Sequence, residues 1–335
     1  MSNILLDVEN ISISFKQYNK GLKQRTIKVI SDLSLNIHEG EIVAILGSSG
    51  SGKSLLAHSI LGILPKNAIQ KGDMYFENQK MTEKLKESLR GEDIALVPQS
   101  VNFLDPLMKI SDQVIGDVPE DKKEEYKVKQ RGIFEKYNLG VEVDDMLPHQ
   151  LSGGMARRVL VSTALMSSPK LVIADEPTPG LDEKSVKETL SYFENMAKEN
   201  VGVLLITHDI DAALKIADRI AIFYAGYVIE DTPISSFIDG NKLLHPYTKS
   251  LYSALPENGF HLTKGHQPLT DEIKKGCPYY QRCPHKLEKC SNETPELKDI
   301  GDNIKVRCFL TLEELENSEN STTLNINEDN KEESL

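Results

Sequence analysis

Apolar residues follow two different spacings along the chain, and segments with the two spacings alternate. Strict alternation of apolar and polar positions predicts strands at 4–15 and 27–37. Short unbroken apolar runs predict buried strands at 41–46, 93–98, 170–175, 201–207 and 219–224. Helical spacing is found at 52–64, 152–167, 183–199 and 209–217. Strands that alternate with helices predict an α/β fold with a mainly parallel sheet, and the first two strands predict an added antiparallel β subdomain.

Three polar segments interrupt or follow this pattern. Residues 16–26 are typical of a hairpin or loop, and the charged segment 119–138 predicts a solvated helix. The stretch 311–335 is acidic, rich in Ser and Asn and poor in apolar residues, and we expect its main part, 313–335, to be a disordered tail. No internal repeat is visible.

The composition narrows the class of protein. The 335 residues are 39% hydrophobic with a formal net charge of −12, which argues against a nucleic-acid binder, because such proteins present a basic face. No apolar run approaches the eighteen residues of a membrane span, and the N-terminal residues lack the pattern of a signal peptide. We therefore expect a cytosolic protein, in which thiols stay reduced and clustered cysteines favour metal binding.

A glycine-rich loop follows the strand at 41–46 and opens the helix at 52–64. Its sequence "GSSGSGKS" fits the phosphate-loop pattern, whose glycines let successive N–H groups point at phosphates. We expect Lys53 to contact the β- and γ-phosphates of ATP and Ser54 to bind Mg²⁺. The predicted ATP-binding residues of the loop are Gly47, Ser48, Ser49, Gly50, Ser51, Gly52, Lys53 and Ser54.

Two acidic residues end the strand in "KLVIADEP" (170–177). Ligands of open α/β sheets collect at the carboxyl ends of strands, so Asp175 is placed to hold Mg²⁺. Glu176, directly after it, is placed to polarise an attacking water. These two residues supply the second half of a predicted ATP-hydrolysing site.

The segment "LSGGMARR" (151–158) resembles the signature of ATP-binding cassette (ABC) proteins, and the resemblance covers residues 1 to about 250. It implies a phosphate-loop ATPase with a RecA-like parallel core, an antiparallel β subdomain and a helical subdomain. In this family Ser152, Gly153 and Gly154 contact ATP held by a partner subunit, so that ATP joins a head-to-tail dimer.

The resemblance implies roles for further residues. Gln99 matches the glutamine that contacts Mg²⁺ or the attacking water, Asp182 matches a subunit contact, and His208 matches the histidine that contacts the γ-phosphate. An aromatic ring is expected to stack on adenine, with Phe15 and Tyr18 as the two candidates. Ser48 departs from the peptide-importer pattern, which usually has Glu there, and "MARR" replaces the more usual "MRQR".

The region after the cassette, 251–312, begins near "HPYT" (245–248) and resembles the C-terminal extension of oligopeptide, dipeptide and nickel importers. It holds all four cysteines, Cys277, Cys283, Cys290 and Cys308, at a spacing unlike that of a zinc knuckle. Four thiolates suffice for a [4Fe–4S] cluster, with zinc or no metal as alternatives. A metal here would act as a staple for an extension with little core of its own.

The resemblance implies an ATPase subunit that powers import of oligopeptides or dipeptides, with nickel or a metal chelate as the alternative cargo. It would pair with a second, homologous cassette and dock on two transmembrane permease subunits at the cytoplasmic face of the membrane. A substrate-binding protein would deliver the cargo. A soluble ABC ATPase that is not coupled to transport is a further alternative, against which the extension argues.

Overall fold

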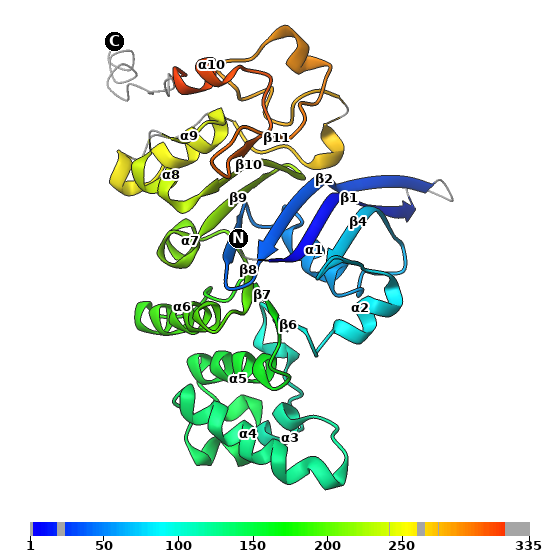
Figure 1. Ribbon diagram of the computed structural model, residues 1–335, viewed down its shortest axis with the longest axis vertical. Helices are drawn as coiled ribbons and strands as arrows, with labels where there is room; N and C mark the ends of the chain where they lie inside the picture. Colours follow the sequence, from blue (N-terminus) through cyan, green and yellow to red (C-terminus); the bar gives the residue numbers. More distant parts are fainter. Residues whose placement is uncertain (1–2, 19–23, 241, 260–264, 274, 319–335) are drawn as a thin grey trace, which may run out of the picture.

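The computed structural model describes residues 3–18, 24–240, 242–259, 265–273 and 275–318. In these ranges the chain forms a sheet of eight strands, a sheet of four strands, a helical lobe and a C-terminal extension (Figure 1). The predicted α/β fold, with its added antiparallel β and helical parts, is confirmed.

The larger sheet has the order β11-β12-β10-β9-β3-β8-β7-β6. Its centre is parallel, because β3 pairs with both β8 and β9, and β7 pairs with both β6 and β8. The core strands are β3 (Ile42–Leu46), β6 (Ile94–Val97), β7 (Leu171–Asp175), β8 (Gly202–Thr207) and β9 (Arg219–Tyr224). Both faces are covered, so β3, β7, β8 and β9 are buried at every position, as unbroken apolar runs predict.

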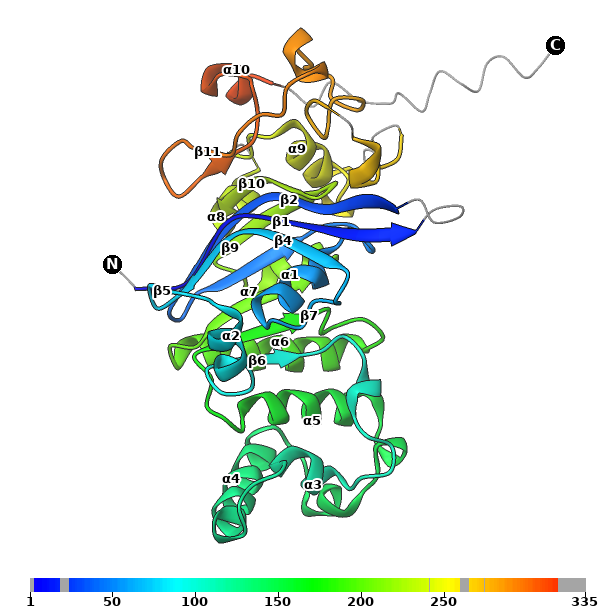
Figure 2. The ribbon, with the colours of Figure 1, turned by 90° about the vertical axis from the view of Figure 1, so that its right-hand side faces the viewer.

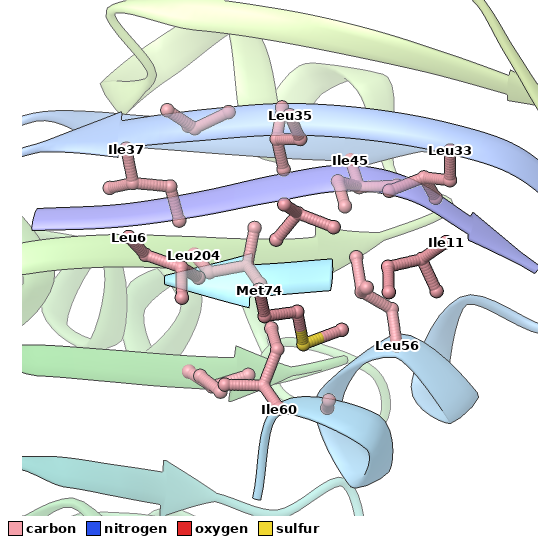
Figure 3. Packing of buried hydrophobic residues seen from close by; sticks show 14 of the residues in the cluster. Leu6, Ile11, Leu33, Leu35, Ile37, Ile45, Leu56, Ile60, Met74 and Leu204 are labelled. Carbon is pink, nitrogen blue, oxygen red and sulfur yellow. The ribbon is translucent and has the colours of Figure 1, made fainter. Parts of the chain in front are cut away.

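The smaller sheet is antiparallel at its centre and lies against the larger one (Figure 2). Its strands are β1 (Ile4–Tyr18), β2 (Gln24–His38), β4 (Ala68–Phe76) and β5 (Gln79–Lys80). The predicted loop at 16–26 is therefore shorter than expected, because β1 and β2 both extend into it. One face of this sheet packs on α1 (Lys53–Ile60) and on the larger sheet (Figure 3). The labelled residues of that core are Leu6, Ile11, Leu33, Leu35, Ile37, Ile45, Leu56, Ile60, Met74 and Leu204.

The remaining helices divide between the sheets and a separate lobe. In the lobe, α3 (Ile110–Ile115), α4 (Lys123–Lys136) and α5 (Gly153–Leu165) pack around Phe134 and Val159, which are fully buried. The others are α2 (Glu83–Leu89), α6 (Glu183–Lys198), α7 (Ile210–Ile216), α8 (Ile234–Asp239), α9 (Pro246–Ser253) and α10 (Leu312–Glu316). The charged segment predicted as a solvated helix is α4, and its buried residues Gln130 and Phe134 face the lobe.

The extension is joined to the cassette through the larger sheet. After β10 (Tyr227–Pro233), strands β11 (Lys298–Asp299) and β12 (Lys305–Val306) continue that sheet at its edge. Arg307 is 2% exposed and donates from Nη1 to Asp32 Oδ2 over 2.9 Å, which fixes the extension to β2. A cassette boundary near residue 250 stays a prediction.

The prediction that disorder begins at residue 313 is wrong for residues 313–318. Thr311 and Glu314 form a capping box that starts α10, and Leu315 is 1% exposed. Lys249 Nζ donates to the Ser318 carbonyl over 2.9 Å. This single buried leucine and the capping box give the acidic segment enough contacts to fold, although its composition is polar. Residues 319–335 lie outside the described part of the chain.

Candidate active site

The phosphate loop connects β3 to α1, as predicted. A Cβ atom on Gly47 would lie 2.7 Å from the Phe223 carbonyl oxygen, so this position of the loop excludes side chains. Lys53 is 5% exposed and its Nζ donates to the carbonyls of Gly47 and Ser48 over 2.7 and 3.0 Å. Burial lowers the pKa of Lys53, although Glu176 and Asp175 lie nearby and oppose the decrease. An anionic phosphate at this position would therefore stabilise the buried ammonium group.

Two oxygen ligands suited to a hard cation lie side by side below the loop. Ser54 Oγ donates to Asp175 Oδ1 over 3.0 Å, which joins the start of α1 to the end of β7. Burial raises the pKa of Asp175, while the hydrogen bond from Ser54 lowers it. A hydroxyl and a carboxylate match the donor set that Mg²⁺ prefers, so these residues fit the predicted Mg²⁺ ligands.

Glu176 and His208 come together from the ends of neighbouring strands β7 and β8. Glu176 is 6% exposed, and its Oε2 lies 2.8 Å from His208 Nδ1. Its Oε1 lies 3.7 Å from Lys53 Nζ. The backbone of Glu176 is in the left-handed region at φ 46°, which is uncommon for a residue with a side chain and concentrates at functional sites.

The signature residues lie at the start of α5, away from the contacts of Lys53. Ser152 is the N-cap of α5 and accepts from the Met155 N–H over 3.2 Å. Ser152, Gly153 and Gly154 line a pocket of about 280 Å³ together with Asp182. Asp182 caps α6, accepting from the Ser185 N–H over 3.1 Å. The structure thus brings together the residues that we expect to face a partner subunit.

Gln99 follows β6 and is exposed, and its role at Mg²⁺ or water stays a prediction. Its carbonyl accepts from Arg157 Nη2 over 3.0 Å, and the Pro98 carbonyl accepts from Nη1 over 2.8 Å. Arg157 is 4% exposed and lies on α5, directly behind the signature. No motif assigned a role to this arginine, although its place in "MARR" beside the signature was a signal in the sequence.

The two aromatic candidates lie near the end of β1. Phe15 pairs with Ile27 of β2 and packs against the core beneath the sheet, whereas Tyr18 is 69% exposed. Stacking of either ring on adenine stays a prediction.

The four cysteines are free thiols in the extension. Burial raises the pKa of Cys277 to about 12, and the charges of the other three cysteines add to the increase, so the four sulfurs lie near one another. Within the described ranges, however, no group of three or more His, Cys, Asp or Glu side chains is arranged to hold a metal ion. The donor set fits an iron–sulfur or zinc site, but binding would have to draw the sulfurs closer together.

Among the described residues, no helix combines the length and apolar character of a membrane span.

The fold and this site define a nucleotide-hydrolysing cassette. The family model "ABC transporter" matches residues 30–179, and the model "Oligopeptide/dipeptide transporter, C-terminal region" matches residues 229–290. A dimeric ATP-binding cassette solved in a post-hydrolysis state with ADP and phosphate superposes with a TM-score of 0.57 at 26% identity. That match covers 69% of this chain and 99% of the solved one. The protein is therefore an ATPase of the ABC class.

Two curated relatives define the family more narrowly. The dipeptide transport ATP-binding protein DppD of Bacillus subtilis is 33% identical, covering 91% of this chain and 94% of the relative. The oligopeptide transport ATP-binding protein AppD of the same organism is 31% identical, covering 92% of this chain and 98% of the relative. The chain belongs to the family of ABC transporter ATP-binding proteins that carry the oligopeptide/dipeptide C-terminal region.

Proposed function

We propose that this protein is the ATP-hydrolysing subunit of an importer for dipeptides or oligopeptides. The observation that carries the proposal is the hydrogen-bonded Glu176–His208 pair beside the phosphate loop, in a chain whose relatives are dipeptide and oligopeptide transport proteins over nearly their full length. A soluble cassette without a transporter would have no need of the importer-type extension at 229–290.

The nucleotide would be shared between two cassettes. ATP lies on residues 47–54 of one subunit, and the signature pocket around Ser152 and Asp182 closes on it from the other. Ser54, Asp175 and Gln99 would hold Mg²⁺, which would neutralise charge on the phosphates. Glu176 then polarises the attacking water, and hydrolysis lets the dimer open. The partner is a second, homologous cassette.

Two transmembrane permease subunits are the expected docking partners, at the cytoplasmic face of the membrane. The segment after Gln99 exposes apolar side chains: Phe103 is 68%, Leu107 89% and Met108 43% exposed. Leu104, Ile110 and Val114 of the same segment are buried and anchor it to the lobe. A segment that only packed in the core would bury all of its apolar side chains, so the exposed ones favour a docking surface. Cargo would come from a substrate-binding protein, and no nucleic acid takes part.

Uptake by a deletion strain tests the cargo. Restoring the wild-type gene should restore accumulation of labelled dipeptides or oligopeptides, whereas the Lys53→Ala variant should not, because the buried phosphate-binding cation is lost. Restored uptake of nickel without peptide uptake would overturn the peptide proposal in favour of the metal-chelate alternative.

We also propose that Cys277, Cys283, Cys290 and Cys308 hold a [4Fe–4S] cluster, with zinc as the alternative. The support is the set of four neighbouring free thiols on one small extension. Their buried thiols would lose protons on binding, so metal would stabilise the extension more at higher pH. Anaerobically purified protein should be brown, with about four irons per chain. Colourless protein with one zinc would support the alternative instead.

A further inference from the structure

A pocket of about 340 Å³ lies beside the phosphate loop and is built from Ala225 and three distant segments. Residues 25–29 of β2 form one wall and residues 48–51 of the loop form another. The third wall is residues 267–271 of the C-terminal extension, which we call the wall segment. The extension therefore reaches the nucleotide site of the cassette, which the sequence motifs do not indicate.

Direct contacts fix the wall segment in this position. Ser48 Oγ donates to Gln267 Oε1 over 3.1 Å, and Thr270 Oγ1 donates to the Val29 carbonyl over 3.1 Å. The Glu272 N–H donates to the Leu269 carbonyl over 3.0 Å and closes a short 3₁₀ turn, and the Leu269 N–H donates back to Glu272 Oε2 over 2.9 Å and caps it. A Cβ atom on Gly226 would come within 2.6 Å of Thr270 Oγ1, so the segment also packs closely on the β9–β10 turn.

The position of the pocket suits the nucleoside half of ATP. The phosphates belong at Lys53 and Ser54, where α1 begins. A Cβ atom on Gly52 would lie 2.6 Å from Val29 Cγ1, so β2 approaches the loop at this point. The pocket continues from Val29 along β2 to Ile27 and Arg25. A nucleotide anchored by its phosphates can therefore extend its ribose and base along β2.

The chemistry of the lining also suits a nucleoside. Ile27, Val29 and Leu269 offer apolar surface to the faces of a flat base. The Leu269 side chain is 64% exposed, so a bound base can bury part of its surface. Gln267 and Thr270 offer polar atoms to the edge of a base or to ribose hydroxyls. The described lining of the pocket includes no aromatic ring, so apolar side chains would supply its contact surface.

We propose that the wall segment forms the outer wall of the nucleoside subsite, where Leu269 and Gln267 contact the base or ribose of bound nucleotide. The inference rests on the proposed binding of ATP at the phosphate loop and deepens it. The C-terminal extension thereby takes part in nucleotide affinity as well as in its own cysteine chemistry.

Binding of MgADP and of Mg-tripolyphosphate to the full-length chain tests the proposal, because the second probe has the phosphates without the nucleoside. Leu269→Ala and Gln267→Ala should each weaken MgADP binding roughly 3- to 10-fold, as expected for a partly buried contact. Tripolyphosphate binding should stay unchanged. Leu312→Ala, an exposed leucine on α10 of the same extension, is the matched control and should change neither.

The outcomes separate this inference from the function on which it rests. Suppose that the wild type binds both probes. If the variants bind both with wild-type affinity, or if their affinity for both probes changes by the same factor, the wall-segment proposal is wrong and the ATP site stands. If the wild type binds neither probe, the ATP site itself is overturned and this inference with it. A thermal melt of each variant checks that lost binding does not come from unfolding.

Photolabelling supplies a readout that does not depend on substitution. An azido group on the adenine of ATP should label the tryptic peptide 265–274, which contains the whole wall segment. Label on the phosphate loop or on β1 and β2 with none on this peptide would contradict the proposal. Excess unlabelled ATP should abolish the labelling.

Discussion

His208 Nδ1 lies 2.8 Å from Glu176 Oε2, so the two predicted catalytic side chains are in hydrogen-bond contact. An ionised carboxylate can only accept, so the imidazole proton in this pair belongs on Nδ1. Lys53 Nζ lies 3.7 Å from the other carboxylate oxygen. A phosphate bound by Lys53 would compete with Glu176 for the lysine. The contact with His208 would then keep Glu176 oriented towards a water.

Glu176→Gln should abolish ATP turnover and leave ATP binding intact. The amide keeps the size of the side chain but cannot take a proton, and loss of a general base costs about 10²- to 10⁴-fold in rate. Phosphate release measures turnover, and light scattering with MgATP should detect a trapped closed dimer. Glu199→Gln, an exposed glutamate paired with Lys136, is the control. Turnover at the wild-type rate in Glu176→Gln would show that another residue activates the water.

Arg157 should act as a positioning residue for Gln99. Its guanidinium joins α5 to the carbonyls of Pro98 and Gln99, so Arg157→Met leaves one buried and one partly buried acceptor without their donor. We expect the free energy of unfolding to fall by about 2 kcal/mol. We also expect kcat for ATP to fall while KM stays near its wild-type value, because the phosphate contacts of Lys53 are not touched.

Arg157→Lys provides the conservative test of that role. One ammonium group can reach a carbonyl but cannot span both, so rescue of kcat should be partial. If both variants have wild-type stability and lose the same amount of kcat, positioning of Gln99 needs both carbonyl contacts of the guanidinium at once. Unchanged kcat in Arg157→Met would remove any role of Arg157 at Gln99.

The parts of the site that follow strands could be predicted from sequence, and the contacts made across the fold could not. Lys53, Asp175 and His208 each lie in a local motif at the end of an apolar strand, and parallel strands bring such ends to one edge. The contact of Gln267 with Ser48 joins residues 219 positions apart and leaves no periodic signal. β4 was not predicted, because Gly72 at φ 93° and flanking charges interrupt its alternation.

The buried ion pairs of Arg219 should matter far more than exposed pairs of similar length. Arg219 Nη1 donates to Asp231 Oδ2 over 2.6 Å and Nε donates to Glu41 Oε1 over 2.9 Å. Arg219→Met leaves Asp231, which is fully buried, without its cation and should cost about 3–5 kcal/mol of unfolding free energy. The exposed Lys80–Asp73 pair, at 2.7 Å, is the control. Lys80→Met should cost far less unfolding free energy in the same urea titration, because an exposed pair is solvated, and equal losses in both variants would contradict the prediction.

His245 should make the protein less stable in mild acid, because its side chain takes up a proton more readily in the unfolded chain than in the folded one. Burial and the charge of Arg307 lower the pKa of His245 from 6.5 to about 3. Below pH 6.5 the unfolded chain therefore takes up a proton that the folded chain refuses, so the free energy of unfolding falls as pH falls towards 3. Nearby Glu230 acts in the opposite direction, because burial raises its pKa to about 6 and its stabilising effect is lost as pH rises through that value.

His245→Asn isolates the histidine, because asparagine can replace its Nδ1 as the N-cap acceptor for the Tyr247 N–H and does not titrate. Both proteins keep Glu230 and Lys249, so their effects cancel in the comparison. Between about pH 7 and pH 5 the wild type should lose about 2 kcal/mol more unfolding free energy than the variant. Urea denaturation at the two pH values measures this difference. If the wild type and the variant lose the same unfolding free energy, His245 can take up a proton in the folded protein. Its burial between α9 and β10 would then not exclude the charge.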